Sequence, residues 1–80
     1  MGDEAERRSE MNIKLTLISD IYDFIEVIRK HPSGVKLSQG NYLVDGKSIL
    51  GVFALNLKEP FFCLTEDGNY DDFEAFVNKL

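Results

Sequence analysis

The side chains most able to do chemistry in this chain are Ser48, His31 and Cys63, together with a carboxylate cluster near the C-terminus. Ser48 follows Gly46 and Lys47, which matches the end of a phosphate-binding GxxxxGK[ST] loop. The first glycine of that motif is missing, and the residues before it predict a turn rather than a parallel strand. The hydroxyl stands instead where an N-cap belongs, because it precedes an apolar run and can accept a hydrogen bond from a free helical amide.

The histidine and the cysteine are each the only one of their kind. One of each gives no zinc constellation, and a single cysteine cannot form an internal disulfide. Cys63 lies in the apolar stretch EPFFCLTED, which predicts a buried, unreactive thiol. His31 follows two basic residues and precedes Pro32, which indicates a structural or solvent-facing residue at the end of a helix. A catalytic Ser–His pair would require the fold to bring this imidazole to Ser48.

The carboxylates of TEDGNYDDFE include Asp67, Asn69 and Asp71 at alternate positions, as at the start of a calcium-binding EF-hand loop. That loop requires glycine at its sixth position and glutamate at its twelfth, but Asp72 and Asn78 occupy them here. Acidic residues in the first turn of a helix also complement the positive end of its dipole. The sequence therefore favours a helix start over a metal site, and we expect no metal and no cofactor.

Two segments carry the apolar period of an amphipathic helix. The members of the two stripes recur at i, i+3, i+4 and i+7, and they are Ile21, Phe24, Ile25 and Ile28, then Phe73, Phe76, Val77 and Leu80. Ser19 or Asp20 is expected to cap the first helix, and Pro32 is expected to stop it. Because Phe24 and Phe76 lie on these stripes, both should be almost inaccessible to solvent.

Strands are predicted between these helices. Apolar and polar residues alternate in residues 12–19, which is the period of a half-buried strand. Residues 35–44 predict two short strands around Gly40 and Asn41, a pair that tolerates a tight turn. Residues 61–66 predict a fourth strand.

With a short helix after Ser48, the expected element order is β-α-β-β-α-β-α. Two helices with one apolar stripe each must cover a common surface, and the four strands supply it. We therefore expect an α+β fold in which a four-stranded antiparallel sheet is covered on one face by helices, as an open-faced β-sandwich. Residues 11–80 would form this domain, and residues 1–10 are expected to be a flexible N-terminal tail.

Composition narrows the classes of function. Eighty residues with 44% hydrophobic and 29% charged side chains are typical of one ordered domain. The formal net charge of −5 repels phosphate backbones and anionic lipids, so we expect neither nucleic-acid binding nor membrane binding. No segment has the length and hydrophobicity of a signal peptide or a membrane span, which indicates a cytoplasmic protein.

The segment GKSILGVFAL at residues 46–55 resembles the region around the regulatory serine of HPr, which reads KSIMGVMSL in Gram-positive members. HPr is the histidine-containing phosphocarrier of the bacterial sugar phosphotransferase system. The similarity extends back through VKLSQGNYLVDGKS and forward through the last strand into the final helix, so it covers residues 12–80. The expected element order is also the HPr order, and the resemblance therefore implies an HPr-like open-faced β-sandwich.

The same resemblance reveals a departure. An active HPr carries its phosphorylated histidine between the first strand and the first helix, in a pattern like GIHARPA. The corresponding stretch here is LISDIYD, which has no histidine, arginine or proline. Without a nucleophilic imidazole the transfer chemistry has no carrier. The resemblance thus implies a divergent member that is neither an enzyme nor a competent histidine phosphocarrier.

Two functions remain open. In the first, the chain is a regulatory or adaptor protein, with Ser48 as a phosphorylation site and Lys47, Ile49, Leu50 and Phe53 as partner-binding residues. A two-turn helix cannot bury all of its apolar side chains, and an exposed apolar patch often marks a docking surface. The partners implied by the family are phosphotransferase-system components or a transcriptional regulator. In the second, the fold is a structural or homodimerisation module and is not phosphorylated.

Overall fold

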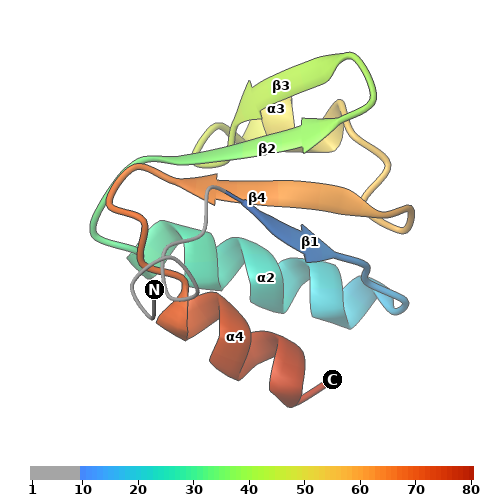
Figure 1. Ribbon diagram of the computed structural model, residues 1–80. Coiled ribbons are helices and arrows are strands. Elements are labelled where there is room, and N and C mark those ends of the chain that lie inside the picture. The colour runs from blue at the N-terminus through green and yellow to red at the C-terminus, as the bar shows by residue number, and fades with distance from the viewer. Residues whose placement is uncertain (1–9) are drawn as a thin grey trace.

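A computed structural model describes residues 10–80 (Figure 1). Of the expected tail at residues 1–10, all but Glu10 lies outside the described residues. The elements, labelled as in Figure 1, are β1 Met11–Ile13, α2 Ile18–Lys30, β2 Val35–Gln39, β3 Tyr42–Asp45, α3 Ile49–Phe53, β4 Phe61–Thr65 and α4 Asp71–Asn78. The expected α+β class and the order β-α-β-β-α-β-α are confirmed for this part of the chain.

The four strands form one antiparallel sheet in the order β1-β4-β2-β3. In the register of the sheet, Leu37 on β2 lies opposite both Cys63 on β4 and Val44 on β3. Gly40 has φ +58° in the turn between β2 and β3, a conformation that glycine adopts without steric strain. The turn predicted at Gly40-Asn41 is therefore confirmed.

One face of the sheet is covered and the other is open. Side chains that alternate along β2 and β4 are almost fully buried on the covered face, and these are Val35, Leu37, Phe61 and Cys63. Their neighbours Lys36 and Phe62 point to the other face and are exposed. Figure 1 shows α2 and α4 side by side under the covered face. Because helices cover only one side, the arrangement is an open-faced sandwich.

The first strand is shorter than residues 12–19. β1 ends at Ile13, whose partner Phe61 is the first residue of β4. The residue before Phe61 is Pro60, which has no N–H group to donate to a further ladder bond. The prediction of a longer strand was therefore wrong, although Leu15 is fully buried.

The predicted cap of the first helix was also wrong. α2 begins at Ile18, and its N-cap is Leu17, which forms no side-chain cap hydrogen bond. Ser19 and Asp20 consequently lie inside the first turn, where the Asp20 amide donates to the Leu17 carbonyl at 3.0 Å. The helix ends at Lys30 as predicted, because the residue that precedes Pro32 is extended, with ψ 134°.

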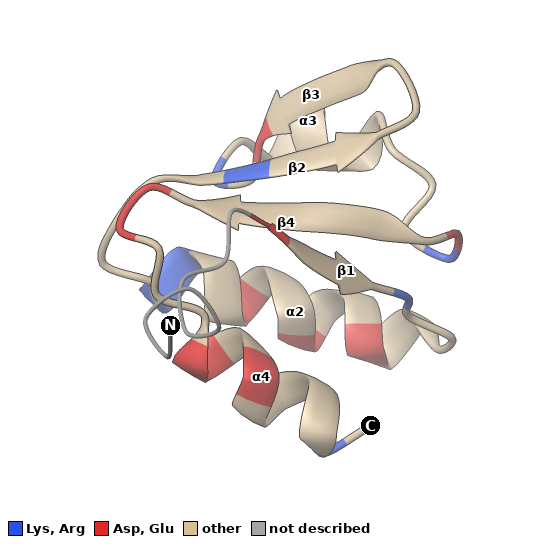
Figure 2. Cartoon of the chain, viewed as in Figure 1, with Lys and Arg blue, Asp and Glu red and all other residues tan. Residues whose placement is uncertain are grey.

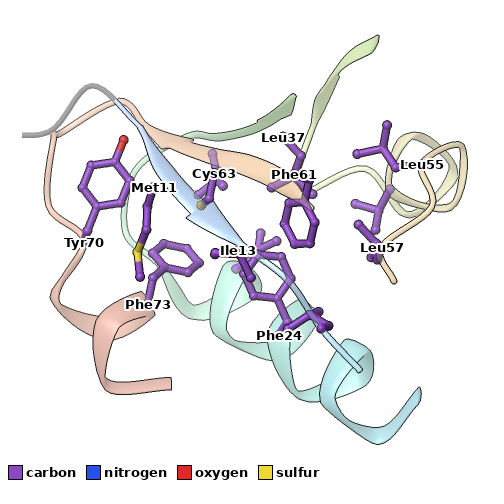
Figure 3. Packing of buried hydrophobic residues seen from close by; sticks show 14 residues of the cluster. Met11, Ile13, Phe24, Leu37, Leu55, Leu57, Phe61, Cys63, Tyr70 and Phe73 are labelled. Atoms are coloured by element: carbon purple, nitrogen blue, oxygen red, sulfur yellow. The ribbon is translucent and has the colours of Figure 1, made fainter. Parts of the chain in front are cut away.

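The core lies between α2, α4 and the sheet (Figure 3). The Phe24 ring is fully buried, and its centroid lies 5.3 Å from that of Phe61 and 5.8 Å from those of Phe73 and Phe76. Phe76 itself is only partly buried, and Leu80 is 55% exposed. The second stripe therefore packs mainly through Phe73, and the prediction that Phe76 would be almost inaccessible was wrong. Cys63 is buried as predicted.

Charged side chains are distributed around this core (Figure 2). Acidic residues line α2 and the first turn of α4, and basic residues lie at the C-terminal end of α2. α3 carries no charged residue. In the described part of the chain, no helix is long and apolar enough to cross a membrane.

Candidate functional site

Ser48 is the N-cap of α3. Its φ of −97° and ψ of 115° are extended, and its Oγ accepts a hydrogen bond from the Gly51 amide at 3.3 Å. The Ser48 carbonyl accepts the first helical bond, from Val52, at 2.9 Å. The predicted cap is confirmed, and its side chain is exposed to solvent.

The three apolar residues of the expected patch all face solvent. Ile49 is 62% exposed, Leu50 86% and Phe53 57%, whereas Val52 is buried. α3 lies against β3 at Gly51, where an added Cβ would come within 3.3 Å of the Val44 Cβ. A five-residue helix makes about one and a half turns, so seating Gly51 and Val52 on the sheet leaves the other side uncovered. We call Ile49, Leu50 and Phe53 the α3 patch.

Lys47 has a different environment from the α3 patch. Its Nζ donates to the backbone carbonyl of His31 at 2.7 Å, and its amide donates to the Asp45 carboxylate at 2.9 Å. An ammonium at the last carbonyls of a helix also complements the negative end of the dipole. Lys47 therefore joins the turn before α3 to the end of α2.

His31 is placed in a way that the sequence did not predict. Its side chain is only 1% exposed, and both ring nitrogens lie at carboxylates. Nδ1 is 2.8 Å from an oxygen of Asp72, and Nε2 is 3.1 Å from an oxygen of Asp67. The ring also packs against Phe73, with a centroid separation of 5.3 Å. The structural alternative is confirmed, the solvent-facing alternative is wrong, and the imidazole is not paired with Ser48.

The electrostatics of this cluster follow from its burial and its hydrogen bonds. Burial lowers the pKa of His31, but the hydrogen bonds to Asp72 and Asp67 and their negative charges outweigh it, so the pKa is raised above the ordinary 6.5. The pKa of Asp67 is lowered to about 2, first by the hydrogen bond from the Asn69 amide and then by His31 and Ser33. Burial raises the pKa of the Cys63 thiol to about 12, which keeps it neutral and unreactive.

The acidic segment before α4 forms turns. The carboxylate of Asp67 accepts from the Asn69 amide at 3.0 Å, and the Asn69 side chain accepts from the Asp71 amide at 2.9 Å. These oxygens therefore satisfy backbone donors at the start of α4, as the dipole interpretation predicted. Within residues 10–80, no group of three or more His, Cys, Asp or Glu side chains is placed to hold a metal ion.

Two separate features thus emerge: the capped α3 with its patch, and the buried cluster of His31, Asp67 and Asp72. Local spacing predicted the first. In the second, His31 is separated in the sequence from Asp67 by 36 positions and from Asp72 by 41 positions, so no local pattern could show it. Its only sequence signals were a histidine next to a helix-stopping proline and an acidic segment before a second helix.

Comparison with protein-family models, with curated proteins and with solved structures gives no significant match. The likeness to HPr therefore depends on the residues of the α3 segment and on the order of the elements.

Proposed function

We propose that this chain is an HPr-like regulatory or adaptor protein that binds a protein partner through the α3 patch, with Ser48 as its phosphorylation site. The observation that carries the proposal is the exposure of all three apolar residues on a helix whose N-cap is Ser48. The segment that resembles the regulatory serine of HPr is thus both accessible to a kinase and adjacent to apolar surface. The element order, which is that of HPr, supports the same proposal.

Phosphorylation would change this surface without unfolding the domain. A phosphoryl group adds roughly −1.5 to −2 charges, and its oxygens can accept from the Gly51 amide that the hydroxyl already contacts. α3 has no charged residue of its own. The modification would therefore place the only strong charge of this helix at the edge of the α3 patch, where it would alter the affinity of a docked partner.

The proposal excludes histidine phosphotransfer. Lys14–Leu17, which connects β1 to α2, contains no histidine. His31 is buried and both of its ring nitrogens have carboxylate partners, so neither is free to attack a phosphoryl donor. We expect no acid-labile phosphate on the protein after incubation with phosphorylated enzyme I of the sugar system. Phosphohistidine at position 31 would contradict the proposal.

The decisive experiment is incubation with an HPr kinase and ATP, followed by measurement of the intact mass. We expect the mass of one added phosphoryl group, located at Ser48 by peptide mapping and absent from Ser48→Ala. The matched control is Ser38→Ala, which removes a hydroxyl on β2 and should still be phosphorylated once. An unmodified wild-type protein, or the same phosphate on Ser48→Ala, would overturn the assignment of Ser48.

The α3 patch would equally serve the alternative, a homodimerisation module without phosphorylation. Sedimentation of the purified protein distinguishes the two. A monomer is expected for an adaptor, whereas a dimer that Leu50→Glu dissociates would favour the alternative. Leu43→Glu is the matched control, because Leu43 is 65% exposed and lies on β3, outside the patch. In either form, we place the protein in the cytoplasm.

A further inference from the structure

The hydrogen-bond partners of the His31 ring determine which protonation state of the ring is favoured. An ionised carboxylate can only accept hydrogen bonds, and a neutral imidazole has one N–H to donate. Here both ring nitrogens lie at carboxylate oxygens, at 2.8 and 3.1 Å. With both carboxylates ionised, only the doubly protonated imidazolium can donate to both. A neutral ring would instead turn one lone pair toward a negative oxygen.

Water cannot replace either partner, because the side chain of His31 is only 1% exposed. A buried polar atom without a partner is costly, so the ring has a strong preference for the state that satisfies both nitrogens. The carboxylates themselves are 35% and 39% exposed, so solvent supports their ionised forms. The other carboxylate oxygen of Asp72, Oδ1, also accepts from the Phe73 amide at 2.9 Å.

From this geometry we infer that His31 is an imidazolium latch, which fastens the end of α2 to the first turn of α4 and to the turn at residues 65–69, and which releases that turn from α2 when it loses a proton. The Asp67 contact is the one that should break. It is the longer of the two, and the Asp67 carboxylate keeps the Asn69 amide as a donor at 3.0 Å when the ring no longer donates. The Asp67 amide donates to the Ser33 hydroxyl at 3.3 Å, which is also a long bond. Asp72 is held within a helix and should keep its bond.

The other ionisable groups of the elements around the ring do not reverse this inference. They are Cys63 on β4, Glu66 within the turn, Lys47 before α3, Asp71 and Glu74 on α4, and Arg29 and Lys30 on α2 itself. The Cys63 thiol stays neutral. The ammonium of Lys47 is occupied by the His31 carbonyl and not by the ring, and Arg29 pairs with Glu26 on the exposed side of α2. Asp67 and Asp72 are therefore the charges that hold the proton.

The test is a pH titration of the ring by nuclear magnetic resonance, and it is simple because the chain has one histidine. Below pH 6.5 we expect nitrogen shifts of an imidazolium, with both ring nitrogens protonated, and a pKa above 6.5. The Gly68 and Asn69 amide signals should shift with the same midpoint. A ring that is neutral at pH 6.5 would overturn the inference. Amide signals that do not change during the titration would overturn the release of the turn.

Three variants separate the latch from general effects of charge. Asp67→Asn and Asp72→Asn each remove one negative partner and should each lower the pKa of His31. Asp71→Asn removes the same charge from the same helix turn, but Asp71 is exposed and its neighbour carries the contact, so the pKa should shift less. Equal shifts in Asp67→Asn and Asp71→Asn would contradict the latch. If Asp72→Asn does not fold, Asp67→Asn and the wild-type titration still decide the question.

Discussion

The hydrogen bond from the Gly51 amide to the Ser48 hydroxyl is 3.3 Å long and exposed to solvent. We therefore expect Ser48→Ala to lose about 0.5–1 kcal/mol of unfolding free energy, the lower part of the range for N-cap removal. Ser48→Asp should stay within about 0.5 kcal/mol of the wild type, because a carboxylate also accepts from the free amide. Urea unfolding measures both values. A loss in Ser48→Asp as large as in Ser48→Ala would argue against the cap.

Two phenylalanines on the helical stripes should differ in their contribution to stability. Phe24 is fully buried among three aromatic rings, and Phe24→Ala should lose about 3–5 kcal/mol, a large part of the stability of a small domain. Phe76 is only partly buried, so Phe76→Ala should lose at least about 1 kcal/mol less. Thermal melting ranks the two. Equal losses would mean that Phe76 is covered in solution.

Single residues differ in how well their sequence neighbours predict them. The Ser48 cap depends on the three residues that follow it, and the sequence therefore predicted it. The N-cap of α2 was mispredicted because Ser19 and Asp20 are good capping residues, yet the chain enters the helix at Leu17. The sequence left open whether His31 is structural or solvent-facing, because both of its partners come from a distant part of the chain.

Between elements, the contact of the end of α2 with α4 and with the turn before α4 should depend on pH. His31 has a raised pKa in the folded state, so its contribution to stability is complete below 6.5 and is lost as the pH rises through the raised value. Asp67 has a lowered pKa, so its contribution is present above 3.8 and is lost as the pH falls toward about 2. Stability from this cluster should therefore be greatest between about pH 4 and 6.5.

The measurement is the urea midpoint against pH, taken up to about pH 8, below the ordinary thiol pKa of 9.0. The midpoint should fall above pH 6.5 in the wild type and in Asp71→Asn. It should fall less in Asp67→Asn, which lacks one of the two partners. A wild-type midpoint that does not change from pH 6 to 8 would rule out a contribution from His31.

The existence and type of each element could be predicted from periodicity, but several boundaries could not. The stripe from Ile21 to Ile28 predicted α2 because its four apolar residues recur on one face over about two turns of a helix. β1 was predicted too long because its length depends on its partner, and β4 cannot extend past Pro60. The alternation of buried and exposed side chains continues to Leu15 for a different reason. Leu15 is buried in the core although it is not paired with β4.

For the molecule as a whole, Cys63 gives a measure of opening. The thiol is fully buried at the centre of the sheet and its pKa is about 12, so a disulfide reagent should reach it only when the domain opens. We expect slow labelling of the wild type, faster labelling of Phe76→Ala, and labelling without delay in urea. Equal rates in native buffer and in urea would show that the sheet does not protect this residue.

The strand order β1-β4-β2-β3 also determines when the sheet can be completed during synthesis of the chain. β2 and β3 are neighbours in sequence and can pair as soon as both have left the ribosome. β1 must wait for β4, which pairs it from Ile13 to Phe61 across roughly 50 residues, or about 2–10 s of translation. During that interval the sheet lacks β4, so the apolar stripe of α2 is only partly covered. We therefore expect the nascent chain to expose part of this stripe until β4 has been made.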